Sequence, residues 1–190
     1  MSIFQENLAE HNKLFAILGS LEPEVETAGK SIAESLSGGH KVMFCGNGGS
    51  AADSQHLAAE LTGRFLKDRP PLAAIALSTD SSALTCIAND YSFADVFLRQ
   101  VQALGQKGDC LVGISTSGNS ENVQRAIAAA REVGITTIGL LGRDGGEIRE
   151  LCDITIIVPS DVTARIQEAH IIIGHTLCGM IEANLGMTGD

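Results

Sequence analysis

Short apolar runs alternate with helical segments along most of this chain of 190 residues. Uninterrupted apolar runs are typical of strands that are buried on both faces, as in a parallel sheet covered by helices. Right-handed crossovers between such strands give a doubly wound sandwich, with ligand sites at the carboxyl ends of the strands. The sequence therefore predicts a single α/β domain over residues 1–190. Its expected strands are Lys41–Cys45, Leu72–Leu77, Cys110–Ile114, Ile135–Leu140 and Ile154–Val158.

Helical spacing of apolar residues predicts the helices that surround these strands. Two helices, over residues 2–19 and from Pro23 to Gly38, come before the first strand. We expect this N-terminal segment, residues 1–37, to contact other subunits, and packing onto its own domain is the alternative. The other helices are expected over residues 51–63, 81–88, 93–104, 121–133 and 161–185, with a short one after Gly146.

The charge of the chain argues against two classes of partner. With 23 acidic and 13 basic residues the net charge is −10, so nucleic-acid backbones and anionic membranes are repelled at long range. The polar N-terminus lacks the apolar core of a signal peptide, and no apolar run is long enough to span a bilayer. Five cysteines without a C-x-x-C spacing indicate reduced thiols. We therefore expect a cytoplasmic protein that binds neither nucleic acid nor membrane.

Two loops rich in glycine and hydroxyl groups follow the first and third expected strands. The segment 115–120, Ser-Thr-Ser-Gly-Asn-Ser, offers four hydroxyls at a strand-to-helix turn, where a phosphate dianion can bind. A helix cap needs only one of these hydroxyls. The segment 46–50, Gly-Asn-Gly-Gly-Ser, lacks the G-x-G-x-x-G spacing and the Walker lysine, so dinucleotide binding is poorly supported. It is either a turn with positive φ or a place where backbone approaches a ligand.

Candidate metal ligands occur on two expected helices. His56 and Glu60 are spaced i, i+4 and share a helix face, whereas Gln167 and His175 lie about 80° apart around their helix. Imidazole and carboxylate ligands suit zinc or a similar divalent ion. A surface pair and a core histidine are the alternatives, and His11 and His170 are further candidates. The pair Asn89-Asp90 is either a turn or part of the same edge as the two loops.

Four stretches that span nearly the whole chain carry a family resemblance: CGNGGSAADSQHLAAELTGR (45–64), IANDYSF (87–93), GISTSGNSENV (113–123) and ARIQEAHIIIGHTLC (164–178). On these stretches the chain resembles the sugar isomerase (SIS) domain proteins, and more closely the phosphoheptose isomerases. The resemblance implies a five-stranded, parallel, flavodoxin-like sheet in a three-layer sandwich, and a homotetramer with sites between subunits. It also implies conversion of sedoheptulose 7-phosphate to D-glycero-D-manno-heptose 7-phosphate, which feeds the heptose of lipopolysaccharide core or related surface glycans.

The resemblance also implies roles for particular residues. One zinc ion per subunit is expected at the positions of His56, Glu60, Gln167 and His175, and Glu60 and His175 match the acid/base residues. The positions expected to hold substrate are Asn47, Gly48, Gly49, Glu60, Asn89, Asp90, Ser115, Thr116, Ser117, Ser120 and Gln167.

The chemistry of ketose–aldose isomerisation is consistent with Glu60 and His175 as the acid/base residues. A proton must move between adjacent carbons through an enediol, and a carboxylate can take and return it. A neutral imidazole near pH 7 suits the protons on oxygen. The hypothesis is Glu60 as the base at carbon and His175 as the shuttle at oxygen, although the sequence does not fix which group serves which atom.

A non-catalytic relative is the alternative. The adaptor that associates with the bacterial replication initiator shares the GNG-x-S, IAND, IST-x-GNS and ARIQE patterns. It lacks the residues matching Glu60 and His175 and carries a basic residue in place of Ser117. The enzyme's residue stands at all three positions here, so the sequence favours the isomerase.

Overall fold

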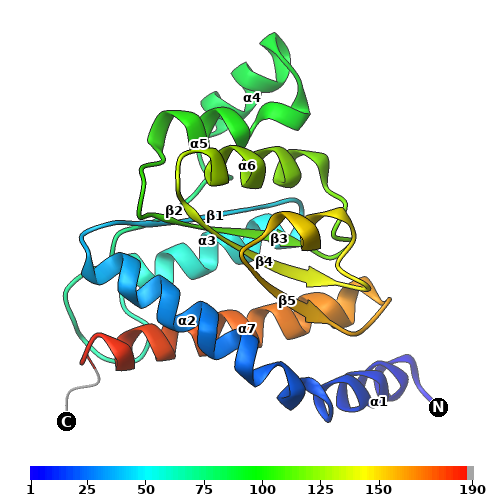
Figure 1. The fold of residues 1–190 in the computed structure, drawn as a ribbon. Coiled ribbons are helices and arrows are strands. Elements are labelled where there is room, and N and C mark those ends of the chain that lie inside the picture. Colours follow the sequence, from blue (N-terminus) through cyan, green and yellow to red (C-terminus); the bar gives the residue numbers. More distant parts are fainter. Residues whose placement is uncertain (188–190) are drawn as a thin grey trace.

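The central layer is a parallel sheet of five strands in the order β2-β1-β3-β4-β5 (Figure 1). A computed structural model describes residues 1–187 of the chain. The flavodoxin-like order and the parallel pairing confirm the expected α/β sandwich. The strands are β1 (Val42–Gly46), β2 (Ala74–Ala76), β3 (Cys110–Ser115), β4 (Thr136–Gly142) and β5 (Ile154–Val158).

Alternate residues of the strands supply two separate apolar cores. Val42 and Phe44 of β1 belong to one core, whereas Met43 and Cys45 belong to the other. This division follows from the period of two residues along a strand, which sends successive side chains to opposite faces. Both faces of the sheet are therefore shielded from water, which explains why the strand sequences are continuous apolar runs.

Helices cover both faces of the sheet (Figure 1). The first core is closed by α2, α3 and α7, and the second by α4 to α6 with the 3₁₀ turn η3. The helices of the first face are α2 (Glu22–Ser37), α3 (Gly49–Thr62) and α7 (Thr163–Asn184). Those of the second face are α4 (Ser81–Asp90), α5 (Leu98–Leu104), α6 (Glu121–Glu132) and η3 (Glu147–Leu151).

The second strand is shorter than the expected span of residues 72–77. Leu72 donates its backbone N–H to Leu61 at the end of α3, at 3.0 Å, instead of joining the sheet. The strand β2 pairs only with β1, and its Ile75 is 36% exposed. The strand was predicted at this place, but its bounds differ because β2 is an edge strand, and an apolar run does not reveal how many neighbours a strand has.

The helix expected over residues 93–104 is broken in two. A 3₁₀ turn, η2 (Phe93–Asp95), precedes α5. The carboxylate of Asp95 accepts hydrogen bonds from Ser92 at 2.8 Å and from Arg125 of α6 at 2.7 Å, which hold this turn. The helix expected over residues 81–88 is longer than predicted, since Asn89 and Asp90 form the end of α4.

The two N-terminal helices have different environments. The helix α1 (Ile3–Phe15) begins with a capping box between Ser2 and Gln5, and buries only Leu14. Its Ile3 and Phe4 are 78% and 74% exposed. The helix α2, which follows the 3₁₀ turn η1 (Leu18–Leu21), buries an apolar face in the first core. The alternative of packing onto its own domain therefore holds for α2, and α1 remains the candidate for contacts between subunits.

His170, which the sequence offered as a further candidate metal ligand, lies in the core on α7. It is fully buried, and its Nε2 bonds the carbonyl of Leu141 at 3.0 Å. Burial lowers the pKa of His170 from 6.5 to about 4, and the bond to the Leu141 carbonyl opposes this only in part. Protonation of this imidazole is therefore unfavourable in the folded protein.

Acid is expected to weaken the fold through His170. The folded pKa lies below the unfolded one, so this stabilisation is complete above pH 6.5 and is lost as the pH falls toward 4. The shift corresponds to a loss on the order of 3 kcal/mol. Urea denaturation of wild type and His170→Gln, both in chelator, checks this, since glutamine keeps a donor but does not titrate. Parallel stability curves for both proteins over pH 4–7 would contradict the assignment.

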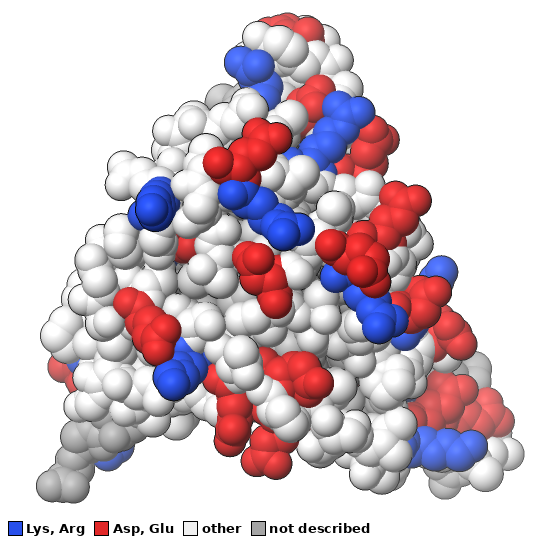
Figure 2. Space-filling view, in the orientation of Figure 1, with Lys and Arg blue, Asp and Glu red and all other residues white. Residues whose placement is uncertain are grey.

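Surface charge is mixed over the visible face of the molecule. Figure 2 shows acidic and basic side chains interspersed on that face, without an extended basic area. Among the described residues there is no helix with the length and apolar character needed to cross a bilayer.

Candidate active site

Two helices that are distant in sequence, α3 and α7, lie side by side and run in the same direction. Gly49 at the start of α3 lies against the amide of Gln167, and Leu57 in the middle of α3 lies against Gly174. Near the end of α3, the ring of Phe65 stacks on His175 with centroids 5.5 Å apart. Successive residues along α3 therefore lie beside successive residues along α7.

This arrangement brings His56, Glu60 and His175 together. The Nε2 atoms of the two histidines are 2.8 Å apart, and His56 Nε2 is 3.5 Å from Glu60 Oε1. One ligand atom from each of the three side chains lies within 4.8 Å of the others. The two imidazoles share a hydrogen bond only when one nitrogen carries a proton and the other does not.

The donor set of this cluster fits a divalent ion such as zinc. Two imidazole nitrogens and one carboxylate are the usual ligands of a catalytic zinc, which keeps a further position for water or substrate. Zn–N bonds of about 2.0–2.1 Å place two tetrahedral nitrogens about 3.3 Å apart, so the histidine pair needs to open by about half an ångström. Small side-chain rotations suffice for such a change.

Asp53 was missed by the sequence analysis and faces the same cluster. It lies three residues before His56 on α3, and its Oδ2 is buried without a hydrogen-bond partner in the described part of the chain. Burial raises the pKa of the Asp53 carboxyl, and the imidazoles of His56 and His175 oppose that rise. Asp53, His56 and Glu60 are spaced i, i+3 and i+7, which places them on one face of a helix. This spacing could have identified Asp53 from the sequence.

Gln167 lies at the other end of the paired helices. Its side-chain nitrogen is 2.2 Å from the place where a Cβ on Gly49 would stand, so only glycine leaves room for it there. His56 lies about 10 Å further along α3, at 1.5 Å per residue. Gln167 therefore contacts the loop after β1, and its assignment as the fourth metal ligand stays a prediction.

The two loops expected to hold phosphate are neighbours, as the parallel sheet requires. Gly46 at the end of β1 pairs with Ile114 near the end of β3. The side chains of Asn47 and Asn122 exchange two hydrogen bonds, of 2.9 and 2.8 Å, between the first loop and α6. The loops flank the point where the strand order changes direction, which is the usual ligand position in open α/β sheets.

Hydroxyl groups of the second loop converge on one another. Ser115 Oγ lies 3.0 Å from Ser120 Oγ and 3.5 Å from Ser117 Oγ. Ser120 is the N-cap of α6 but its hydroxyl makes no capping bond to the helix. A helix N-terminus that keeps its amides free beside several hydroxyls can accept an anion.

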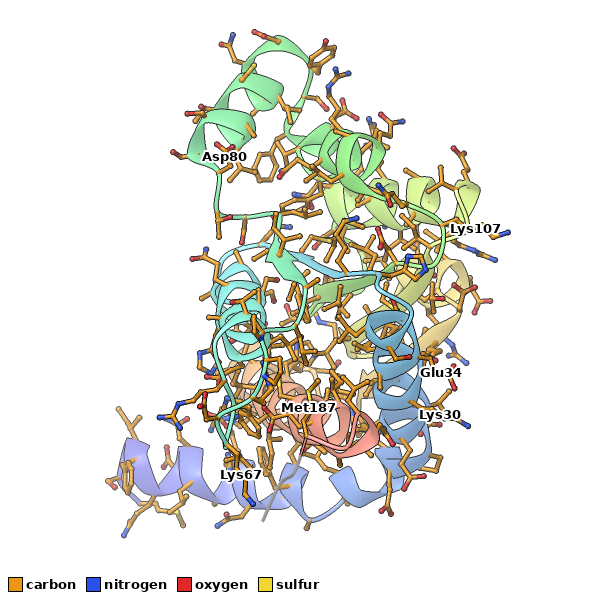
Figure 3. The ribbon with its side chains drawn as sticks, turned by 90° about the vertical axis from the view of Figure 1, so that its left-hand side faces the viewer. Lys30, Glu34, Lys67, Asp80, Lys107 and Met187 are labelled. Carbon is orange, nitrogen blue, oxygen red and sulfur yellow. The ribbon has the colours of Figure 1, made fainter. Side chains whose placement is uncertain are left out.

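Asn89 and Asp90 lie on α4, and their side-chain hydrogen bonds within the described residues stay on that helix. They lie on the exposed end of α4, and Asn89 Nδ2 donates to Asp90 Oδ1 at 2.8 Å. Figures 1 and 3 show α4 projecting from the molecule, with Asp80 at its base and Met187 far away near the end of α7. The expectation that Asp90 shares the edge of the two loops stays a prediction.

The other candidate histidine is also outside the cluster. His11 on α1 bonds Glu168 at 2.9 Å and stacks on Phe15. The three-residue cluster on α3 and α7 is thus the candidate centre for chemistry, and the paired loops are the candidate anion site.

Comparison with known proteins agrees with this architecture. Residues 9–142 match the SIS domain family model. Phosphoheptose isomerase of Aliarcobacter butzleri is 53% identical, with 97% of each chain covered, and that of Nitratiruptor sp. is 58% identical, with 94% of this chain and 96% of the relative covered. The chain belongs to the phosphoheptose isomerase family. The structure of phosphoheptose isomerase from Neisseria gonorrhoeae matches with a TM-score of 0.89 and 47% identity, over 95% of this chain and 97% of that one.

Membership of the phosphoheptose isomerases accounts for two features of the site. An isomerase of a sugar phosphate needs an anion site and a group that moves protons, and the paired loops and the cluster on α3 and α7 offer these. The alternative of an initiator-binding adaptor gains no support from these comparisons.

Proposed function

We propose that this protein converts sedoheptulose 7-phosphate to D-glycero-D-manno-heptose 7-phosphate through an enediol. The juxtaposition of Glu60 with His175 carries the proposal, since it places a carboxylate and an imidazole in one cluster. These groups have the chemistry to move protons at carbon and at oxygen near neutral pH. Relatives named phosphoheptose isomerase, at more than half identity over nearly the whole chain, support the same reaction.

Glu60 is the proposed base at carbon, and His175 the proposed proton shuttle at oxygen. Glu60 is partly buried, with 22% of its side chain exposed, so it is accessible to a substrate without being fully solvated. The ring of His175 stacks on Phe65, which restricts its orientation. Oriented groups of this kind typically contribute about 10²–10⁴-fold each to the rate of proton transfer.

The proposed cofactor is one zinc ion per subunit, held by His56, Glu60 and His175, with Gln167 as the fourth ligand implied by the family. The chemistry of the three clustered donors supports it. A bound zinc ion supplies positive charge that stabilises an enediolate. His56 then acts as a ligand alone, whereas Glu60 and His175 also handle protons.

The substrate phosphate is proposed to bind the paired loops. The start of α6, which has no side-chain cap, and the converging hydroxyls support this assignment. Gln167 lies against Gly49, and this position beside the loops supports its proposed contact with the sugar. The proposed binding residues are Asn47, Gly48, Gly49, Glu60, Asn89, Asp90, Ser115, Thr116, Ser117, Ser120 and Gln167.

A homotetramer with sites between subunits is the proposed assembly. Asn89 and Asp90 lie at the exposed end of α4, and Tyr91 and Phe93 beside them are 59% and 62% exposed. Exposed apolar groups next to binding residues indicate a surface that a second copy covers. Sedimentation equilibrium is expected to give about four times the chain mass of 19.9 kDa. A monomer at the same concentration would exclude shared sites.

The product is proposed to enter the heptose of lipopolysaccharide core or a related surface glycan, from a cytoplasmic enzyme. Free cysteines at all five positions and the acidic composition support the compartment. Loss of heptose from the surface glycan in a strain without this protein, with the protein in the cytosolic fraction, is the measurement for both parts.

Turnover of sedoheptulose 7-phosphate by the purified protein tests the reaction and the metal together. We expect heptose 7-phosphate to appear in NMR spectra, to fall at least about 10²-fold after chelation, and to return with zinc. Turnover that does not depend on metal keeps the isomerase and removes zinc from the mechanism. A folded tetramer that shows no turnover with any divalent ion contradicts the proposed function.

A further inference from the structure

A buried ion pair joins the end of α3 to α7. The side chains of Arg69 and Glu182 are 2% and 3% exposed, and Arg69 Nε donates to Glu182 Oε1 at 2.8 Å. Arg69 follows α3 in a segment that is otherwise mostly exposed. No motif in the sequence singles out either residue, since 113 positions separate them.

The guanidinium of Arg69 binds the backbone of the turn that carries Glu60. Its Nη2 donates to the Glu60 carbonyl at 2.7 Å, and its Nη1 donates to the Leu61 carbonyl at 2.7 Å. Carbonyls in the last turn of a helix have no partner within the helix, and a cation there also interacts favourably with the helix dipole. The last turn of α3, and with it the Glu60 side chain, is thereby fixed relative to α7.

The carboxylate of Glu182 is linked to His175 through Phe65. Its Oε1 also accepts a hydrogen bond from the backbone N–H of Phe65, at 3.3 Å. The ring of Phe65 stacks on His175, with centroids 5.5 Å apart and planes inclined by 26°. The same ion pair therefore contacts the backbone of Glu60 and the residue that packs against His175.

We propose that Arg69 and Glu182 are positioning residues that set the distance between Glu60 and His175 for proton transfer and metal binding. This inference rests on the proposed function of the cluster. Neither side chain touches the cluster's ligand atoms, so the pair acts through the backbone of Glu60 and the ring of Phe65. A shift of about 1 Å in such a geometry can reduce the rate about 10²-fold.

A double substitution separates positioning from stability. Replacing a buried ion pair by apolar residues of similar size is often neutral for stability, whereas removing one partner leaves a costly buried charge. We expect Arg69→Met/Glu182→Leu to unfold within a few degrees of wild type, while Arg69→Met alone lowers Tm by about 10 °C or more. In the double variant kcat is expected to fall about 10–100-fold, with KM nearly unchanged.

Zinc affinity provides a readout that does not depend on turnover. Competition with a chelator is expected to show about tenfold weaker zinc binding by the double variant. Arg69→Lys is the companion in case the double variant does not fold: lysine keeps the charge beside Glu182 but lacks the fork that reaches two carbonyls. We expect Arg69→Lys to stay folded, with a reduced kcat and zinc affinity.

Lys41 offers a matched control. Its ammonium lies 2.6 Å from the buried carboxylate of Asp109, and among the described residues neither partner bonds to α3 or α7. Lys41→Met is expected to lower Tm and to leave kcat and zinc affinity as in wild type. A double variant that is folded and has wild-type kcat and zinc affinity overturns the proposal. Weakened zinc binding in the double variant, with no turnover even by wild type, sustains positioning and refutes the proposed reaction instead.

Discussion

Substitution of Glu60 by glutamine is expected to lower kcat for sedoheptulose 7-phosphate by about 10³-fold, with little change in KM. The amide has nearly the shape of the carboxylate but cannot accept a proton from carbon. Glu60 lies about 16 Å from the start of α3, where the phosphate loops are, so binding of the phosphate end should persist. NMR in D₂O measures both product formation and exchange of the substrate proton with solvent, and both are expected to be lost.

Zinc content distinguishes the two roles of Glu60. The side chain belongs to the candidate metal cluster, so zinc bound to Glu60→Gln is to be measured beside its activity. A variant that keeps zinc and loses proton exchange supports the role of base. Gln55→Ala, on an exposed face of the same helix, is the control that should retain activity. Rapid proton exchange in Glu60→Gln would mean that another group serves as the base.

Gly118→Ala is expected to cost the fold about 3 kcal/mol or more, because two penalties combine at this position. Gly118 has φ of +68°, and a Cβ there would stand 2.0 Å from the carbonyl oxygen of Gly145. This neighbour is backbone from the loop after β4, which cannot move aside as a flexible side chain can. The hydroxyl loop and the loop of Gly145 would have to separate, so KM for the substrate should rise in any folded fraction.

Alanine variants at two other glycines separate the cost of a positive φ from the cost of the steric clash. Gly39 has φ of +80° with open space around its Cβ position, and Gly19 has open space without a positive φ. Urea denaturation is expected to rank the alanine variants as Gly118 the least stable, then Gly39 at a loss of about 1 kcal/mol, then Gly19 close to wild type. Equal losses at Gly118 and Gly39 would show that the contact between the two loops is not tight in solution.

The sheet and its loops were predictable because their causes are local in sequence. Uninterrupted apolar runs marked the strands β1, β3, β4 and β5 to within a residue or two. The glycine and serine loops follow β1 and β3, and parallel strands place such loops at one edge whatever the details of packing. The proximity of His56 and Glu60 was also predictable, because residues i and i+4 lie on the same face of a helix.

Tertiary structure decided which distant residues meet. The contact between His56 and His175 spans 119 positions, and it depends on α3 and α7 packing side by side in the same direction. The same packing joins Arg69 to Glu182 and leaves Asp53 facing the cluster. Periodicity defines a face on each helix, but only the packed core determines which faces meet, because that choice depends on side-chain volumes across the whole domain.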